Sequence, residues 1–346
     1  FIRMHMRSWT KKRRLIILVF ICLAALTAGA GVGSVQMSPG DILAILGHQL
    51  FARPLPEGIS QNQVSILWTL RLPRCLCAFL VGGALAASGT VMQSVLRNPL
   101  ASSYTLGVSS GASLGAALVI VSGFLLPVAG FLTLPLAGFI FGLGTVFAVI
   151  AFASRMDRGL QNQTIILTGM VFSLFVNALI TLVSVLEQNY MQQLLLWQMG
   201  SFSGRSWEQA GILAAVLIPG TLYLCHFSRQ MDMMTFGEEA AQTMGVDTKR
   251  VKLKLIVAAS LLTGTAVCFT GTIGFIDLIA PHVARKVFGP AHRYALPVSV
   301  LFGGAFMVLA DLAARTVLAP TELPVGAVTA LIGAPFFAWV YFKEKA

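Results

Sequence analysis

Long apolar runs fill most of the chain, and short polar segments separate them. Most of the runs are close to the roughly 20 residues that an α-helix needs to cross a bilayer. The pattern predicts an all-α, polytopic membrane protein with about ten transmembrane helices in a single transmembrane domain, residues 1–346. The expected helices lie at about 15–35, 131–154, 164–186, 210–227, 255–271, 276–287, 295–314 and 326–342, with two more inside 67–118.

The longest polar run inside this pattern is 231–254, MDMMTFGEEAAQTMGVDTKRVKLK, which we expect to form a short cytoplasmic helix. Thr235 and Glu238 have the spacing of a capping box, and Gly245 lies where helices often end in a left-handed residue. A helix of about two to three turns is marginal in water on its own. We therefore expect the loop at about 229–254 to dock on an ATP-hydrolysing subunit. A solvated loop helix is the alternative.

Composition supports the membrane assignment, because 56% of the residues are hydrophobic and only 11% are charged, against about 25% in soluble proteins. A net charge of +11 would suggest nucleic-acid binding in a soluble protein, but here the bases lie beside apolar runs. Alternating the polar segments across the membrane assigns 19 Lys and Arg to the cytoplasm and five to the exterior. This asymmetry predicts a cell-membrane protein with both termini cytoplasmic and no nucleic-acid partner.

The start of the chain, FIRMHMRSWTKKRR, carries six Lys or Arg ahead of the first apolar run. This arrangement is typical of a signal anchor with a cytoplasmic N-terminus. The sequence AGA at 28–30 imitates a signal-peptidase site, but the apolar run is longer than that of a signal peptide, so we expect it to be retained. The polar segment 37–62 is expected outside, with a short helix that begins at Ser38 and Pro39.

Two arginines and three glycines stand out in the second and third expected helices. Arg71 and Arg74 lie at the outer mouth of the second helix, where they could meet an acidic partner or anchor the helix in lipid headgroups. Gly107, Gly111 and Gly115 recur every four residues on one helix face. Small residues at this spacing let helix backbones approach closely, so we interpret them as packing residues.

Motifs of enzymatic chemistry are absent from the sequence. No G-x-x-x-x-G-K-[ST] loop occurs, and Gly is nowhere followed by Lys, so we do not expect ATP to bind this chain through a P-loop. H-E-x-x-H and G-x-S-x-G are also absent, and the five cysteines show no C-x-x-C spacing. We expect no catalytic residue, no metal site and no cofactor, and a passive path that another subunit drives.

Three ionisable residues, Asp277, His282 and Asp311, lie in apolar runs, where charge is costly and often marks function. Asp311 and Arg315 are spaced i, i+4, so a helical ion pair is the simpler interpretation of that aspartate. His282 follows Pro281 near a helix end, where a structural role is favoured. A proton-coupled secondary transporter that uses these three residues as a relay is a rival hypothesis. A membrane scaffold that transports nothing is another.

Eight sequence motifs resemble, in order and spacing, those of the FecCD family, the membrane permeases of type II ABC importers for iron-siderophores, haem and vitamin B12. The motifs are LRLPR (70–74), Q-x-x-x-x-N-P-L-A (93–101), LGVSSGA, GEEAAQTMGV, IGFIDLIAPHVAR, HRYALPVS, LADLAAR and TELPVGAVTALIGAPFF, over about 68–337. The possible pathway or packing residues are Asn98, Pro99, Gly107, Gly111, Asp277, Pro281 and His282.

The resemblance implies a permease of ten helices beside a second copy or a homologous permease, with the translocation path between them. It also implies two cytoplasmic ATP-binding subunits and an extracytoplasmic substrate-binding protein. The expected ligand is a ferric siderophore, with haem or cobalamin as alternatives. By the same resemblance, the arginines that contact acidic residues of the binding protein are Arg71, Arg74 and Arg315. The residues of the coupling helix are Gly237, Glu238, Glu239, Ala240, Ala241 and Gly245.

Two residues depart from the family pattern. Asp277 stands where the family usually has glycine in its G-F-[IV]-G-L motif, and Thr272 replaces a common proline. Because acids favour helix N-termini, Asp277 could cap the short eighth helix. It could equally touch the pathway.

Overall fold

The computed structural model describes residues 11–127, 129–157 and 159–345, which form helices and turns without a strand. Seven helical segments of this part of the chain are long and apolar enough to cross a membrane. They are α2 (Lys11–Gly31), Gln61–Val95, α7 (Gly130–Met156), α8 (Asn162–Leu186), α10 (Trp207–His226), α13 (Thr248–Thr270) and α15 (His292–Thr316). Three of the bases counted above, Arg3, Arg7 and Arg158, lie outside the described residues.

Two helices with a shorter apolar stretch, together with α14, are the further candidate crossings among the described residues. α6 (Val108–Ser122) and α16 (Val325–Lys345) are apolar, and α14 (Ile276–Phe288) is an amphipathic helix of 13 residues. The total agrees with the predicted number of about ten transmembrane helices. The chain is therefore an all-α, multi-pass membrane protein.

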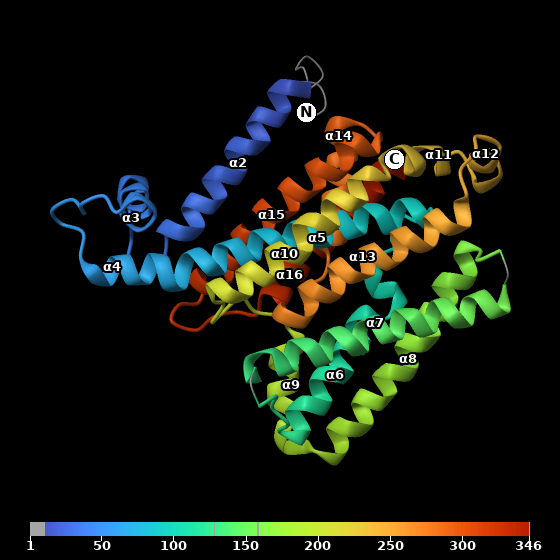
Figure 1. Cartoon of the computed structure of the whole chain (residues 1–346), viewed down its shortest axis with the longest axis horizontal. Coiled ribbons are helices and arrows are strands. Elements are labelled where there is room, and N and C mark those ends of the chain that lie inside the picture. Colours follow the sequence, from blue (N-terminus) through green and yellow to red (C-terminus); the bar gives the residue numbers. More distant parts are fainter. Residues whose placement is uncertain (1–10, 128, 158, 346) are drawn as a thin grey trace.

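The remaining helices are short and lie mostly at the two ends of the molecule. Their bounds are α3 (Pro39–Phe51), α4 (Gln61–Ser65), η1 (Ile66–Arg71), η2 (Ser103–Leu106), η3 (Gln188–Tyr190), α9 (Met191–Gln198), α11 (Ser228–Met234) and α12 (Glu238–Thr243). Figure 1 shows α3 and α4 at one end of the long axis and α11 and α12 at the opposite end. These two ends are the candidates for the two membrane surfaces.

Helix α5 (Leu72–Val95) occupies the centre of the bundle and packs against α10, α13, α14 and α15. Glycines set how closely it approaches its neighbours. A Cβ added at Gly82 would lie 2.3 Å from the Gly303 carbonyl oxygen, and one added at Gly89 would lie 1.9 Å from that of Asp277. The α5–α15 and α5–α14 contacts therefore form backbone against backbone, as small residues allow in membrane helices.

The predicted packing of α6 through small residues is confirmed for two of the three glycines. A Cβ at Gly111 or Gly115 would lie 2.5 Å from a carbonyl oxygen of α7, that of Phe141 or of Ala137. Gly107 also lies close to α7, because a Cβ there would lie 2.7 Å from the Thr145 Cγ2 atom, but it precedes α6 as its N-cap with a left-handed φ of +83°. Its backbone conformation explains the glycine there, since other residues adopt this region at a cost.

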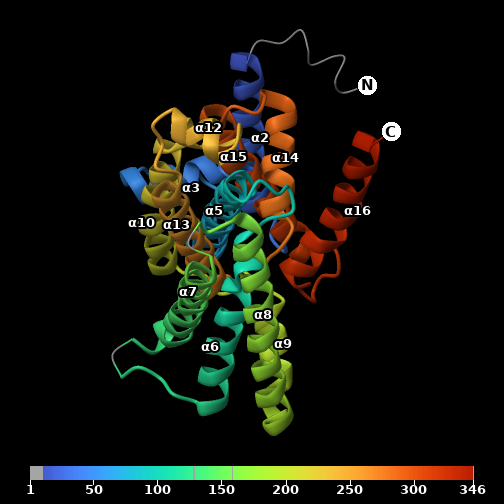
Figure 2. The same ribbon diagram turned by 90° about the vertical axis from the view of Figure 1, so that its right-hand side faces the viewer.

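Helices α6, α7, α8 and α9 lie in the lower part of the view in Figure 2, and α7 and α6 pack against α13. α6 contacts α7, α8 and α9. The outer face of α8 carries large exposed apolar side chains, including Leu174 (71% exposed), Phe175 (62%) and Leu186 (71%). In a membrane protein such a face contacts lipid or another transmembrane chain.

The helix predicted to begin at Ser38 and Pro39 is present as α3, with the capping box complete. The Ser38 Oγ accepts from the Asp41 backbone N–H at 3.1 Å, and the Asp41 carboxylate accepts from the Ser38 N–H at 2.9 Å. This reciprocal pair satisfies two backbone donors that a helix start otherwise leaves open.

Candidate functional site

The polar loop between α10 and α13 contains two short helices, and α12 is smaller than predicted. α12 has six residues, Glu238–Thr243, and its N-cap is Gly237 with φ +119° and no side-chain cap. The expected capping box between Thr235 and Glu238 is wrong, because the Thr235 hydroxyl donates to the Asp232 carbonyl at 2.6 Å. Gly245 has φ +87°, so the predicted left-handed C-terminal residue is confirmed.

Glu238 points to a partner within the chain. Its carboxylate lies 2.5 Å from the Nζ atom of Lys252 on α13, and the lysine side chain is only 1% exposed. The same Nζ donates to the Leu160 carbonyl at 2.9 Å and to the Asn162 Oδ1 at 2.8 Å. Lys252 thus ties α12 to the loop between α7 and α8 with all three of its donors.

The α7–α8 loop is shaped to receive this lysine. Asp157 accepts from the backbone N–H groups of Gly159 (2.8 Å) and Gln161 (2.7 Å), which lowers the pKa of its carboxyl group. Leu160 between them adopts a left-handed φ of +52°. A non-glycine residue in this region is uncommon. The turn therefore holds the Leu160 carbonyl in a fixed direction.

The coupling residues predicted from sequence divide into two sets in the structure. Glu238 contacts Lys252, and Ala241 is fully buried against the chain. Glu239 is exposed, and two apolar side chains flank it in the loop, Phe236 (79% exposed) and Met244 (48%). The loop therefore exposes two apolar side chains and a carboxylate. Phe236 and Met244 are not among the residues that the sequence singled out.

Arg74 lies at the opposite end of the molecule from α12, between two carboxylates. Its Nε and Nη2 atoms donate to Asp311 at 2.9–3.1 Å, and its Nη1 and Nη2 atoms donate to Glu322 at 2.8 and 3.0 Å. These hydrogen bonds lower the pKa of Glu322, in the loop after α15. The predicted Asp311–Arg315 pair is a minor one, with 3.9 Å between Nε and Oδ2. Arg74 is the main partner of Asp311.

The two other arginines of the predicted docking set turn toward the backbone of α2 and the segment after it. Arg71 is 5% exposed, and it donates to the carbonyls of Ala30 (3.0 Å), Gly31 (3.0 Å) and Val35 (2.6 Å). Arg315 donates to the Gly29 carbonyl. Both arginines therefore satisfy carbonyls that the end of α2 leaves open. In this conformation the guanidinium groups of both arginines are held by the chain's own carbonyls, and their contact with a binding protein stays a prediction.

Asp277 is buried in the first turn of α14, next to α5. The N-cap of α14 is Phe275, with φ +70° and no side-chain cap, and the Oδ1 atom of Asp277 has no hydrogen-bond partner among the described residues. On α5, the Gln93 amide donates to the Asp277 carbonyl at 3.2 Å and accepts from Arg285. Asp277 is not the N-cap residue of α14, but its carboxylate accepts hydrogen bonds in the first turn from its own backbone N–H and that of Leu278, and another from the Ser102 hydroxyl.

The other pathway candidates shape turns and helix ends. The Asn98 Oδ1 accepts from the Leu100 N–H at 2.9 Å, so Asn98 and Pro99 form the tight turn after α5. Pro281 is buried inside α14, and His282 follows it, half-buried. Asp311 lies near the C-terminal end of α15 with Arg74, whereas Asp277 begins α14 beside α5. Asp277 and Asp311, which the proton-relay hypothesis joins, thus lie on different helices and contact different residues.

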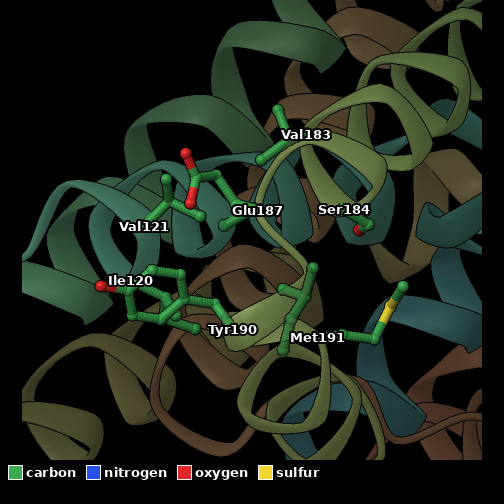
Figure 3. A pocket seen from close by; sticks show the side chains of 9 residues that line it. Ile120, Val121, Val183, Ser184, Glu187, Tyr190 and Met191 are labelled. Carbon is green, nitrogen blue, oxygen red and sulfur yellow. The ribbon is translucent and has the colours of Figure 1, made fainter.

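Three hollows differ in their capacity for a ligand. The one in Figure 3, lined by Glu187, Tyr190, Met191 and the ends of α6 and α8, measures about 10 Å³, which is close to the space of one water. A second, at the α3–α4 end, measures about 320 Å³ and includes Asp41 and Glu57. A third, of about 340 Å³, lies among α6, α8 and α9. Only the last two reach the volume of small-molecule sites.

The residues that the structure describes contain no cluster of potential metal ligands. Among them, no three His, Cys, Asp or Glu side chains stand close enough together to hold a metal ion. The cysteines are free, and all but Cys225 are buried.

Comparison with known proteins gives consistent matches over nearly the whole chain. The model of the FecCD transport family matches residues 16–343. A cobalamin import permease from Halobacterium salinarum is 39% identical and covers 84% of this chain and 77% of its own. A hemin transport permease from Yersinia pestis is 36% identical, with 81% and 84% covered. A solved metal-chelate type ABC transporter in an inward-facing conformation superimposes with a TM-score of 0.84 at 29% identity, covering 96% and 99%.

Proposed function

Because the chain belongs to the FecCD transport family, we propose that it is the permease of an ATP-driven importer for ferric siderophores. The relatives described above are importer permeases for cobalamin and haem. Permeases of this family are not themselves enzymes and work with ATP-binding and substrate-binding proteins. In this proposal two ATP-binding subunits drive a pair of permeases, either two copies of this chain or this chain and a homologue.

The observation that carries the proposal is the surface of the α10–α13 loop. Phe236 and Met244 expose apolar side chains there on both sides of Glu239, at the end of the molecule opposite α3. An exposed Phe in a short polar loop fits a site that a partner covers. Behind this surface, Lys252 connects α12 to the start of α8. A motion imposed on α12 by an ATPase would therefore reach α8 directly.

On this assignment the α12 end is cytoplasmic, and the two chain termini lie on the cytoplasmic side. The α3–α4 end then faces the substrate-binding protein. Docking by Arg71, Arg74 and Arg315 stays a prediction, and their internal partners would have to be exchanged for acidic residues of the binding protein. Asp41 and Glu57, which line the hollow at this end, offer an alternative contact for basic residues.

The test is reconstitution of the chain in proteoliposomes with its ATPase and binding protein. Uptake of a ferric siderophore should require ATP and should survive collapse of the proton gradient. Uptake that follows the proton gradient without an ATPase would establish the secondary-transporter alternative instead. Haemin and cobalamin, tested in the same vesicles, decide between the siderophore and the two other ligands of the family.

The loop surface is tested by Phe236→Asp and Glu239→Lys. Each should abolish most ATP-driven uptake or release the ATPase. Phe236→Asp removes an apolar side chain from the contact, and Glu239→Lys reverses the charge of the carboxylate there. The matched control is Glu57→Lys, the same charge reversal at the α3–α4 end, which should keep the ATPase bound. Normal uptake in both loop variants would contradict docking at α12.

A further inference from the structure

A polar pocket lies among α6, α8 and α9, within the part of the protein assigned to the membrane. Its volume is about 340 Å³. The residues that line it are Tyr104, Ser109, Ser110, Ser113, Ser173, Asn177, Gln198 and Thr272. Each of these side chains carries a hydroxyl or an amide group, and none carries a charge. We refer to this hollow as the serine pocket.

Hydrogen bonds within the protein already use most of the hydroxyl protons of the serine pocket. They run from Tyr104 Oη to the Ile273 carbonyl (2.7 Å), from Ser173 Oγ to the Gly169 carbonyl (2.8 Å), from Ser110 Oγ to the Gly107 carbonyl (3.1 Å), and between Ser109 Oγ and Thr272 Oγ1 (3.1 Å). The hydroxyl oxygens keep lone pairs that can accept. The wall of the pocket is therefore rich in acceptors.

The donors of the pocket come from few side chains. Asn177 on α8 and Gln198 at the end of α9 each carry a primary amide with two N–H groups and one oxygen. Ser113 adds one hydroxyl from the buried face of α6. No Lys, Arg or His is among the lining residues. A ligand in the pocket would thus meet neutral groups only.

Packing alone gives no reason for this composition. A transmembrane interface gains nothing from exposing hydroxyl and amide groups to a hollow, because each such group must be satisfied by water or by a polar ligand. The position of the serines is also fixed, because Gly111 and Gly115 hold α6 directly against α7. Rigid placement of polar groups around an open volume is characteristic of a binding site.

We propose that the serine pocket contacts one side of a neutral metal chelate whose surface carries amide or hydroxyl groups, and that it discriminates against chelates with free carboxylates. The proposal rests on the import function proposed above and narrows its substrate class. Amide N–H and O–H groups of such a chelate would donate to the hydroxyl oxygens. A carboxylate would lose its hydration without a cation to pair with, and it would face oxygen lone pairs.

The experiment uses the full chain in nanodiscs without ATPase or binding protein. Asn177→Cys is modified with a polar thiol reagent in the presence of four probes: a neutral ferric trihydroxamate, cyanocobalamin, haemin and ferric citrate. The matched control is Thr181→Cys, an exposed position one turn further along α8 and outside the lining. The unsubstituted chain gives the background of its own cysteines.

The trihydroxamate or cyanocobalamin should slow modification of Asn177→Cys on the order of tenfold at saturation, as expected for a site that is mostly occupied. Haemin and ferric citrate should have little effect, and Thr181→Cys should react equally in all conditions. Equal or stronger protection by haemin or ferric citrate overturns the proposal. Protection by none of the four probes, or equal protection of Thr181→Cys, overturns it as well.

A second variant reverses the predicted selectivity. Asn177→Lys places a cation in the pocket, so binding of ferric citrate should strengthen and binding of the trihydroxamate should weaken, each by about tenfold. Unchanged binding of both probes overturns the proposal. Neither measurement uses ATP. ATP-driven uptake without protection at Asn177 would contradict the serine-pocket proposal and leave the proposed import function intact. Protection at Asn177 without ATP-driven uptake would contradict the import function and leave the serine-pocket proposal intact.

Discussion

Asp311 is a buried carboxylate held by a bidentate contact with Arg74, and its side chain is 2% exposed. We predict that Asp311→Ala lowers the free energy of unfolding by about 3 kcal/mol, because a mostly buried guanidinium loses its main partner. Arg74→Met combined with Asp311→Leu should recover part of that loss. Denaturant unfolding in detergent micelles measures these differences.

The matched control is the exposed pair of Arg250 and Asp247, whose side chains are 82% and 53% exposed. Arg250→Ala should change the free energy of unfolding by less than about 1 kcal/mol, since water screens such pairs. If Asp311→Ala and Arg250→Ala cost the same, the Arg74–Asp311 contact contributes nothing special to stability.

Glu322 gives a pH dependence with a defined sign. Hydrogen bonds from Arg74 lower its pKa in the folded protein below the ordinary value of 4.5. The stabilisation is therefore fully present above about pH 4.5 and is lost as the pH falls through the lower folded-state pKa. Glu322→Gln should lower Tm slightly at pH 7, and the gap from the parent protein should close below pH 4.5.

The size of this effect should be small, because the Glu322 side chain is 42% exposed and partly hydrated pairs contribute about 1 kcal/mol or less. Thermal unfolding in detergent from pH 7 to pH 4 is the measurement. Glu57→Gln, a change in an exposed loop at the same end of the molecule, is the control. A Tm gap that widens on acidification would contradict the pairing.

At the scale of helices, the close approach of α5 to α15 leaves no room for an added methyl group. A Cβ at Gly303 would lie 2.5 Å from the Gly82 carbonyl oxygen and 2.5 Å from the Ala86 Cβ. Gly303→Ala should destabilise the protein by about 1–3 kcal/mol, because the helices must separate. Gly144→Ala, at a helical glycine with open space around its Cβ, should be neutral or slightly stabilising.

Thermal unfolding of both variants in the same detergent measures the difference. Equal Tm values for Gly303→Ala and Gly144→Ala would mean that α5 and α15 pack more loosely than the structure describes.

The helices themselves could be predicted from the sequence, because their length and apolar character depend on the bilayer and not on neighbours. The partners of charged residues could not. Arg74 and Asp311 are 237 positions apart, and nothing in either local sequence points to the other. The Gly-Gly pairs at 82–83 and 303–304 could have indicated the α5–α15 contact. A search for small residues four positions apart does not detect such pairs.

The candidate coupling loop shows the same division between local and long-range information. Its polarity and the left-handed Gly245 followed from the sequence, whereas the internal role of Glu238 did not. Lys252 resembles the other bases of the KRVKLK run, and only its burial separates it from them. The serine pocket was also beyond prediction, because its residues come from five separate segments.

At the scale of the whole molecule, Lys252 joins the α12 end to the transmembrane helices. We predict that Lys252→Met lowers uptake while the ATPase stays bound and active, because α12 loses its link to the α7–α8 loop. Backbone amides of 159–162 should exchange hydrogen about tenfold faster as the loop loosens. Lys254→Met, two residues further on and exposed, is the matched control.

Hydrogen exchange by mass spectrometry and transport in proteoliposomes read out the two effects separately. Loss of uptake without faster exchange would mean that Lys252 acts through the ATPase contact alone.

The hydrogen bonds from Arg71 to the backbone at the end of α2 have a consequence for how the protein inserts into the membrane. The guanidinium group belongs to the segment Gln61–Val95, and the carbonyls that it satisfies belong to the end of α2 (Ala30 and Gly31) and to the bend after it (Val35). During synthesis these two segments leave the ribosome before the helices that follow them, and neither the arginine nor the carbonyls can enter the bilayer cheaply unless they meet. We therefore expect them to insert as a hairpin, with every later helix assembling on a pair that is already closed.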